Sequence, residues 1–577
     1  MIPKNQFGAI LLDTRSIQKY VFSCNKLKTN IGASFLVDRI FTDFMKKVLD
    51  ESELAISEKS WEAYTREKEN TPENQVELQI LEKGNENLTA EIAYIGGGNM
   101  LILLRPLAGE AEKSILARCK QLVREWSLKV LMMAPGLKTG AAIGLLDVSP
   151  EHFKSSLDTL YKQLKVHQNM ILPQVDLPYT GLTLTCDYTG KVADERVWGD
   201  ENRWISAEVA AKEQAYRAFE EEFSKTINLP PEYEVASDIQ DLGYLSGKNL
   251  SHENLSGESY ICVIHIDGNN MGVKFSHCRG MQERRALSLK IANVVKDGFN
   301  KILQDIVEDC ENGSYKNWLK LVKDGEKTIL PIRPIIIGGD DVTFVCAGRV
   351  GLLYAQRFIE YVSKQEILNK DLLEAVNQSN QKDHSGDKRI NPMMSCCGGI
   401  AIVPATYPFY RAYELAEQLC DSAKKKSRKY DGSLIDFAVL HGQMTPQLSQ
   451  LERQNYKAPM GFLHAGPYLV AGKGDSDTAK IDDLKKIFDD LKKISTSLSD
   501  DTQSQKGIPR NKVKRLRQVL LQDRHSQTLF LEHCPEMKLE KADDLWTLRN
   551  EESGELVTPY MDAIELERFV IPEFMKG

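Results

Sequence analysis

Three aspartates are the residues of this chain best placed to do chemistry. Asp267 ends the apolar run YICVIHI, and Asp340 and Asp341 follow two glycines in the segment RPIIIGGDDVTFVCAG. The apolar runs on both sides of Gly338 and Gly339 predict a tight hairpin, because glycine allows turn geometry and close approach that other residues resist. Since Asp267 is expected at the end of a neighbouring strand, the three carboxylates should gather in one small site.

Such a cluster of carboxylates repels itself unless a cation is present, and its hard oxygen atoms favour Mg²⁺ or Mn²⁺. Two such ions about 3.5–4 Å apart clamp an attacking hydroxyl and the leaving oxygen of a phosphate. The backbone of Gly268, Asn269 and Asn270, directly after Asp267, is expected to offer N–H groups to phosphates at the start of a helix. Lys424, at the end of a later helix, is expected to contact a triphosphate as a point charge.

Gly-Gly-Asp-Asp is also a common sequence for a hairpin turn without any metal, because glycine and aspartate are typical turn residues. Two observations favour a metal–nucleotide site over it. Asp267 lies where a third carboxylate is needed, and the same scaffold occurs a second time in the chain.

That second copy comes earlier in the sequence. The run FGAILL ends in Asp13, and EIAYIGGGNMLILLRP joins two β-rich runs through a glycine cluster. Both halves then continue with a strand, a short loop containing proline and an amphipathic helix. These ordered matches predict two copies of a strand–helix–hairpin–helix–strand unit, the ferredoxin-like arrangement. Because Gly98 and Asn99 replace the two acidic residues, the first copy is expected to be catalytically silent.

The predicted fold class is α+β, with two ferredoxin-like units, an insert between them and a helical C-terminal domain. The periodic runs DDLKKIFDDLKKI and NKVKRLRQVLL indicate the C-terminal helices. The predicted bounds are 1–165 for the first unit, 166–250 for the insert, 251–445 for the unit with Gly-Gly-Asp-Asp, and 446–577 for the helical domain.

Composition sets the wider limits. The 577 residues carry 74 basic and 82 acidic side chains, a net charge of −8, which excludes a uniformly basic nucleic-acid coat. No run approaches the roughly 18 apolar residues that span a bilayer, and the N-terminus does not have the pattern of a signal peptide. Eleven cysteines without paired spacing indicate a reducing compartment. We therefore expect a cytoplasmic protein with no membrane contact.

Taken together, these motifs resemble the polymerase/cyclase-like signature subunit of type III CRISPR effector complexes (Cas-ten-type proteins). DTRSIQKYVF is similar to the pattern of that family's first palm domain, and LKTNIGASFLVDRIF to the helix that follows it. IDGNNMG, GGDD and AEQLCDSAKKK match the second palm in order. The resemblance covers roughly residues 1–165 and 251–445, and more loosely the C-terminus.

The resemblance implies two palms packed face to face as a pseudo-dimer, with ATP bound between them. It also implies that the second palm joins AMP units into a cyclic oligoadenylate messenger, or a cyclic dinucleotide, for antiviral defence. Asp267 and Asp340 would be metal ligands, and Asp341 would support the metals or activate the attacking 3′-hydroxyl. Gly338 and Gly339 would let the backbone approach the nucleotide, and Ser34 would face it.

Several features depart from this family. The chain has no His-Asp dipeptide, so DNA cleavage by an HD nuclease domain is not expected. The insert has only Cys186 where many members carry two CxxC pairs, so no zinc is expected there. The implied partners are ATP, guide or target RNA, small helical CRISPR effector subunits and a downstream effector that responds to the cyclic nucleotide.

Three alternatives stay open at this point. The chain is either part of a CRISPR ribonucleoprotein or a compact, stand-alone relative. It could be an RNA-binding scaffold subunit with a regulatory palm, although an idle site has no need to keep three repelling carboxylates. It could also be a GGDEF-like cyclase that uses GTP, against which Asp341 and Val342 stand where Glu-Phe is usual.

Overall fold

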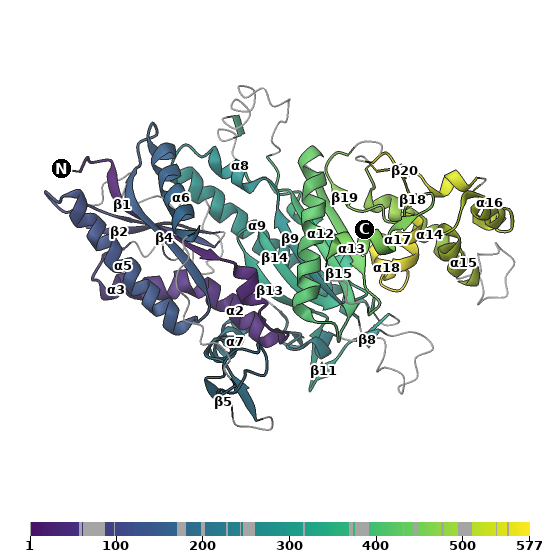
Figure 1. Ribbon diagram of the computed structural model, residues 1–577, viewed down its shortest axis with the longest axis horizontal. Helices are drawn as coiled ribbons and strands as arrows, with labels where there is room; N and C mark the ends of the chain where they lie inside the picture. The colour runs from purple at the N-terminus through teal and green to yellow at the C-terminus, as the bar shows by residue number, and fades with distance from the viewer. Residues whose placement is uncertain are drawn as a thin grey trace.

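The computed structural model describes most of the 577 residues, arranged as an elongated molecule from the purple N-terminal unit to the yellow C-terminal helices (Figure 1). The described residues are 2–56, 61, 87–96, 98–169, 181–197, 202–226, 229–242, 244–245, 260–315, 318–368, 373–374, 392–430, 432–442, 447–474, 478–493, 510–537, 539, 541–550 and 553–576.

The first unit is an antiparallel sheet in the order β2-β3-β1-β4, with helices on both faces. Along the central strand, alternate residues point to opposite faces, so an unbroken apolar run buries both. Ile10 and Leu12 pack with α2, α3 and α5, whereas Ala9 and Leu11 pack with α6. The elements are β1 (Gln6–Arg15), α1 (Ile17–Val21), α2 (Leu27–Arg39), the π-helix η1 (Ile40–Phe44), α3 (Met45–Glu51), β2 (Ala90–Gly96), β3 (Asn99–Leu104), α5 (Glu112–Met133), β4 (Lys138–Asp147) and α6 (Phe153–Asn169).

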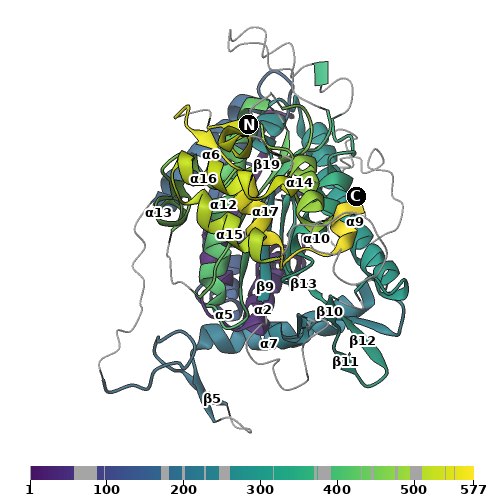
Figure 2. The same cartoon turned by 90° about the vertical axis from the view of Figure 1, so that its right-hand side faces the viewer.

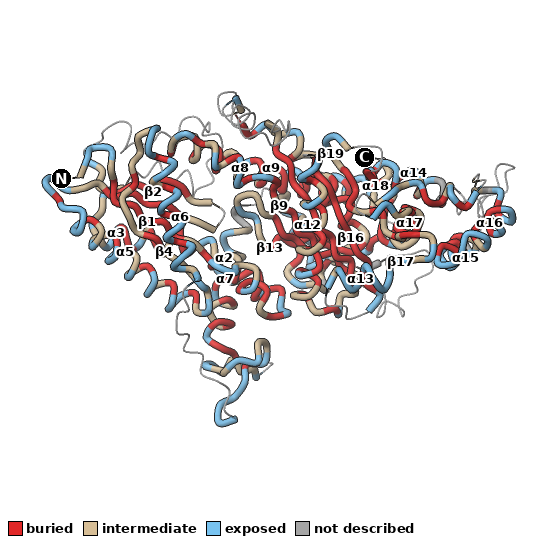
Figure 3. Tube along the Cα trace, turned by 45° about the horizontal axis from the view of Figure 1, so that its top comes forward, coloured by how far each residue is buried: buried red, intermediate tan, exposed pale blue. Residues whose placement is uncertain are grey.

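The second unit repeats this topology. Its sheet has the order β13-β14-β9-β15-β16-β19, of which the first four strands correspond to those of the first unit. Helices α9 and α10 cover the face that contains Ile264 and Ile266, and α12 covers the face of Val263; the sheet is buried along most of its length (Figure 3). The elements are β9 (Tyr260–Gly268), α8 (Met271–Ser276), α9 (Met281–Glu311), β13 (Ile332–Gly338), β14 (Asp341–Ala347), α10 (Gly351–Val362), β15 (Cys396–Pro404), α12 (Phe409–Tyr430), β16 (Ser433–Val439) and β19 (Tyr468–Ala471). The predicted pair of ferredoxin-like units is confirmed.

The two units contact each other reciprocally. Helix α2 of the first unit lies against β13 of the second, and α9 of the second lies against β2 of the first (Figure 1). Each unit therefore presents its first long helix to the first hairpin strand of the other. This is the pattern of a two-fold dimer built within one chain.

The insert joins the units through one long helix and several short strands. The helix α7 (Ala207–Thr226) packs along α2 so closely that a side chain at Gly32 would collide with the backbone carbonyl of Lys212. The strands of the insert are β5 (Glu195–Val197), β6 (Arg203–Ile205), β7 (Tyr233–Val235) and β8 (Tyr244–Leu245), and η3 (Ile239–Leu242) is a 3₁₀ turn. The short strands β10 (Leu319–Lys320), β11 (Lys323–Asp324) and β12 (Lys327–Leu330) follow α9 in the second unit, where β10 pairs with β8 and β12 with β7.

The C-terminal part is helical as expected, but it also contains a small sheet in the order β17-β18-β21-β20. Strand β19 lies beyond residue 445 and yet pairs with β16, so the sheet of the second unit extends past the boundary expected from sequence. The elements are α13 (Leu448–Asn455), β17 (Lys457–Ala458), β18 (Gly461–Phe462), α14 (Ile481–Lys493), α15 (Arg510–Leu520), α16 (Arg524–Glu532), η5 (Pro535–Met537), η6 (Ala542–Leu545), β20 (Leu548–Arg549), β21 (Leu556–Val557), α17 (Tyr560–Leu566) and α18 (Pro572–Lys576). Helices α14, α15, α16 and α17 lie at the right-hand end of the molecule in Figure 1, and Figure 2 views this end with these helices toward the reader. No helix in the described ranges has the length and apolar character to cross a bilayer.

Candidate active site

The Gly-Gly-Asp-Asp motif forms the turn of the β13–β14 hairpin. Gly338 pairs with Asp341, which leaves Gly339 and Asp340 as the two turn residues. Gly339 has φ +60°, a left-handed conformation that glycine adopts without strain at the first position of a two-residue hairpin turn. Strand β14 in turn pairs with β9 so that Asp341 lies opposite Asp267. The three predicted carboxylates therefore meet at one edge of the sheet.

Close approach of the backbone brings Asp340 onto β9. The N–H of Gly268 donates to the carbonyl oxygen of Asp340 at 3.1 Å. A Cβ atom at Gly268 would lie 2.8 Å from the Cβ atom and 2.9 Å from Oδ2 of Asp340, closer than real Cβ atoms come. Position 268 therefore accepts only glycine while Asp340 stays in place.

The three carboxylates of the cluster lie close enough to shift the pKa of Asp340. Burial, followed by the neighbouring charges of Asp267 and Asp341, raises the pKa of Asp340 to about 7. Lys424 forms an ion pair with Oδ2 of Asp267. Burial lowers the pKa of Lys424, but Asp267 outweighs it and the net pKa is raised. The ammonium group of Lys424 thus offsets part of the negative charge of the carboxylate cluster.

His265 is a further member of the site that the sequence analysis did not identify. It is 4% exposed, donates or accepts a hydrogen bond at 3.1 Å with Oγ1 of Thr343, and lies with Nδ1 3.3 Å from Oδ1 of Asp341. Burial lowers its pKa, but the charges of Asp341 and Asp267 outweigh this and raise it. The available signal was its spacing of two residues from Asp267, which puts both side chains on one face of the strand.

In the segment after Asp267 that was predicted to bind phosphates, two of the three residues make hydrogen bonds within the protein. Asn269 is 4% exposed; its Nδ2 donates to Ser427 Oγ at 2.9 Å and to the Gly432 carbonyl at 3.2 Å. Its N–H donates to the Ser395 carbonyl at 2.8 Å, and that of Gly268 is already bonded to Asp340. These two residues therefore hold the loop together instead of facing a ligand. Asn270 is exposed, with φ +57°, immediately before α8.

The other predicted nucleotide-binding residues lie around the hairpin. A Cβ atom at Gly338 would meet nothing within 4 Å, so that side of the turn is open. Ser34 is half-buried on α2, the helix that contacts β13. Lys424 forms its ion pair with Asp267, opposite Asp341 on the neighbouring strand.

The first unit carries the same scaffold with different side chains. Asp13 pairs with Asn99 as Asp267 pairs with Asp341, and the N–H of Thr14 donates to the Gly98 carbonyl at 2.9 Å as Gly268 does to Asp340. Ser16 has φ +54°, matching Asn270 three residues after the other aspartate. Asp13 accepts a hydrogen bond from the Gln168 amide, and burial raises its pKa to about 6. The first unit thus has one carboxylate, Asp13, bonded to the amide of Gln168. The second unit has three carboxylates at the equivalent place, one of which is paired with the ammonium group of Lys424.

The donor set fits a hard cation, although the side chains are not arranged as a ready site. Within the described ranges, no three His, Cys, Asp or Glu side chains are positioned to hold a metal ion. However, Oδ1 of Asp341 is buried and has only Nδ1 of His265 near it, at 3.3 Å. The three carboxylates also repel one another, which favours a hard cation such as Mg²⁺ or Mn²⁺. Binding would require Lys424 to release Asp267.

Comparison with known proteins identifies the class of the second unit. Residues 260–432 match the Cas10/Cmr2 family, second palm domain. No curated protein matches the chain. Among solved structures, a Csm1–Csm4 cassette in complex with cA4 has 13% identity and a TM-score of 0.45, with 98% of this chain and 69% of that chain covered. The apo cassette has 14% identity and a TM-score of 0.44 (98% and 70% covered), and the cassette in complex with one ATP has 14% and 0.38 (86% and 64% covered).

The chain therefore carries a Cas10/Cmr2-type second palm domain, and over residues 260–432 the predicted resemblance is confirmed. The matched residues run from β9 through α12, and so include Asp267, the hairpin with Asp340 and Asp341, and Lys424. From here we call the two units the first and second palm.

Proposed function

We propose that this protein is a Mg²⁺- or Mn²⁺-dependent nucleotidyltransferase that converts ATP into a cyclic oligoadenylate messenger in type III CRISPR defence. The observation that carries the proposal is the meeting of Asp267, Asp340 and Asp341 at one hairpin, with the register that pairs Asp341 with Asp267. The family match over the same residues supports it.

In this proposal, Asp267 and Asp340 would hold the metal ions, and Asp341 would support them or accept the proton of the attacking 3′-hydroxyl. When bound, the metal ions supply Lewis-acid stabilisation of the attacking and leaving oxygens. Lys424, released from Asp267, is within the same cluster and would contact the triphosphate. His265 would hold the carboxylate of Asp341 in position through its Nδ1 atom.

The reciprocal packing of the palms supports the use of two nucleotides. A nucleotide on the first palm, near Ser34, would face one on the second palm, and fixed orientation of two reactants supplies much of the rate of such reactions. ATP is proposed as the substrate because the similar Csm1–Csm4 cassettes were crystallised with ATP and cA4. Guide or target RNA, small helical subunits and a cyclic-nucleotide-responsive effector would be the partners.

A second candidate is a scaffold subunit whose palm is regulatory. One observation favours it: Lys424 neutralises Asp267 in this structure, which closes the cluster to a metal ion until the lysine moves. Copurification of guide RNA without nucleotide turnover would support this candidate.

The test is mass spectrometry of the products formed from all four NTPs with Mg²⁺ or Mn²⁺, with and without RNA that copurifies. We expect a cyclic adenylate product, reduced at least about 100-fold by Asp340→Asn with Asp341→Asn, as loss of several kcal/mol of charge stabilisation requires. Asn99→Ala, at the register position of Asp341 in the first palm, is the matched control and should keep the activity. Product formation that survives the double substitution would refute the proposed site.

A further inference from the structure

The insert has the spacing of a zinc site without its ligands. Cys186 and Thr189 are separated by two residues, as are Ser206 and Val209, and sixteen residues (190–205) lie between the pairs. Two such pairs of cysteines at a separation of about 15–20 residues are a known zinc pattern. Three of the four cysteine positions are therefore occupied by threonine, serine and valine.

The structure brings these four positions together. Cys186 and Val209 are buried in one small apolar cluster with Ile205. Cys186 lies in a tight turn, in which its N–H donates to the Lys191 carbonyl at 2.7 Å and its carbonyl accepts from Gly190 at 3.0 Å. Ser206 stands directly before α7, and its Oγ accepts from the N–H of Val209 in the first turn of that helix at 3.4 Å. The turn that holds Cys186 therefore packs against the first turn of α7.

Polar groups of both segments surround the thiol of Cys186. Burial raises the pKa of this thiol, but donation from the Thr189 hydroxyl and from the N–H groups of Tyr188 and Ser206 outweighs burial and lowers it. The donor set itself does not fit zinc, because valine has no ligand atom and neutral hydroxyl groups are poor ligands compared with thiolate or imidazole. One thiol among four positions is not a zinc site.

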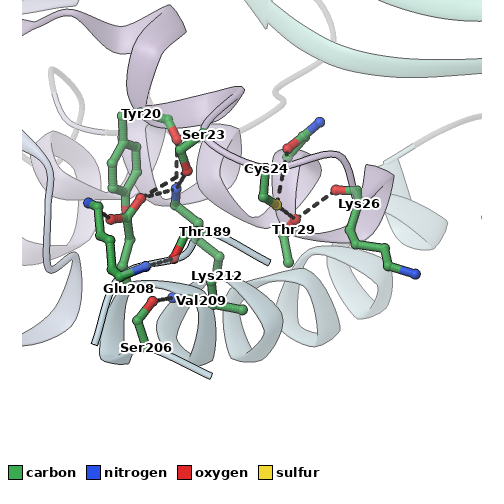
Figure 4. Close-up of polar contacts among 12 residues, drawn as sticks. Tyr20, Ser23, Cys24, Lys26, Thr29, Thr189, Ser206, Glu208, Val209 and Lys212 are labelled. Atoms are coloured by element: carbon green, nitrogen blue, oxygen red, sulfur yellow. Dashed lines mark hydrogen bonds and ion pairs between the residues drawn. The ribbon is translucent and has the colours of Figure 1, made fainter. Parts of the chain in front are cut away.

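A buried ion network fastens the second turn to the first palm (Figure 4). Lys212 is 1% exposed, and its ammonium group donates to Glu208 at 2.6 Å, to the Tyr20 carbonyl at 2.6 Å and to Ser23 Oγ at 2.8 Å. All three of its protons have acceptors. Lys191 of the first turn reaches the other oxygen of Glu208 at 2.7 Å. Both turns therefore connect through Glu208 to the loop between α1 and α2.

We propose that residues 184–191 and 205–212, a turn and the first turn of α7 that packs against it, form a metal-free remnant of a four-ligand zinc site that is fastened to the first palm by Glu208 and Lys212. Its role is to hold the Tyr20–Ser23 loop, which leads into the helix carrying Ser34, without depending on metal supply or on the redox state of several thiols. This inference does not depend on the proposed catalytic function.

The first test measures metal content. The full chain, purified after expression with added zinc, should contain well below about one zinc per chain, the stoichiometry of a four-ligand site. A zinc-selective chelator should leave its melting temperature unchanged. Stoichiometric zinc that the chelator removes with loss of stability would overturn the proposal.

The second test asks whether the zinc-site backbone is retained. Thr189→Cys, Ser206→Cys and Val209→Cys together should create a site that binds about one Co²⁺ per chain with a tetrahedral thiolate spectrum. The matched control places three cysteines on exposed neighbours, as Thr183→Cys, Thr185→Cys and Ala207→Cys, and should show no such spectrum. A folded triple variant without the spectrum contradicts the convergence of the four positions. If the triple variant does not fold, the pair Thr189→Cys and Ser206→Cys should still give a cobalt–thiolate band, and its absence has the same meaning.

The third test concerns the fastening. Lys212→Met should accelerate hydrogen–deuterium exchange in residues 17–32 by more than about tenfold, because it leaves buried Glu208 without its closest cation. Lys191→Met removes a half-exposed lysine from the same carboxylate and should have a much smaller effect. Equal exchange in the wild type and Lys212→Met would show that the network does not hold the loop.

Discussion

At the scale of single residues, the two palms differ at one contact, where the larger side chain lies on the hairpin in the second palm and on the central strand in the first. In the second palm, Gly268 leaves the space that the side chain of Asp340 occupies. In the first palm, the equivalent contact has Thr14 against Gly98, where a Cβ atom would lie 2.7 Å from the threonine hydroxyl. The same backbone hydrogen bond occurs in both palms, but only in the second palm does its acceptor residue have an acidic side chain.

Gly268→Ala tests this contact. The added methyl group would displace Asp340, and we expect product formation to fall by up to about 100-fold, the effect of misplacing a reacting group by an ångström. Gly272→Ala is the matched control, because a Cβ atom there meets nothing within 4 Å. Rates are measured by product chromatography and folding by melting temperature. A Gly268→Ala enzyme as active as Gly272→Ala would mean that the position of Asp340 is unimportant.

At the scale of elements, His464 joins three parts of the C-terminal half. Its Nε2 lies 2.8 Å from Asp436 on β16, and its Nδ1 lies 2.7 Å from Asp562 on α17. The ring stacks on Tyr456 at a centroid distance of 4.8 Å. Both ring nitrogens face carboxylates, which requires the protonated imidazolium. Burial lowers its pKa, but the two aspartates outweigh burial and raise the pKa well above 6.5.

This arrangement predicts a pH-dependent stability with a definite sign. Because the folded pKa is raised, the contribution of His464 is fully present below pH 6.5 and is lost as the pH rises through the folded value. It amounts to about 1.4 kcal/mol for each unit of the shift. The free energy of unfolding is measured by denaturant titration at several pH values from 6.5 upward. It should fall more steeply with rising pH in the wild type than in His464→Gln. Parallel pH profiles would contradict an imidazolium at this position. Glu565, whose pKa is raised to about 7 mainly by burial, titrates in both proteins, and loss of the His464 charge, which lowers that pKa, would raise it further in His464→Gln.

At the scale of the whole molecule, the interface between the palms contains a buried ion pair. Arg285 on α9 donates to Glu91 at 2.7 Å and to the carbonyl groups of Ile92 and Ala93 on β2. Both charged side chains are fully buried. Such a pair contributes little net stability compared with an apolar contact, but removal of one partner leaves the other charge buried and uncompensated.

We therefore expect Arg285→Met to destabilise the protein by about 3–5 kcal/mol. Arg279→Met is the matched control on the same stretch of chain; its pair with Glu283 is exposed and is worth less than about 1 kcal/mol. Denaturant unfolding measures both changes. If Arg285→Met with Glu91→Leu recovers most of the loss, the cost arose from the orphaned carboxylate; if Arg285→Met alone is neutral, the palms are held by other contacts.

Much of the candidate site could be predicted from local sequence. An apolar run that ends in aspartate, and two glycines before Asp340, specify a strand end and a hairpin through backbone preferences that act over a few residues. Ser34, by contrast, was proposed only through family resemblance, and its distance from a nucleotide depends on how α2 packs. The spacing of His265 from Asp267 places both on one face of the strand, but its contact with Thr343 depends on the pairing of β9 with β14. The role of Asn269 could not be predicted, because it depends on burial against Ser427.

The sequence by itself determined the repeat, its topology and the difference between the copies, since strand alternation, turn glycines and residue types are properties of short segments. Only the tertiary structure decided which groups meet across the chain. Lys424 pairs with Asp267 and Arg285 with Glu91, over separations of 157 and 194 residues. No local preference encodes such contacts, because they arise when two helices from distant segments are buried against the same sheets and each buried charge must find a partner.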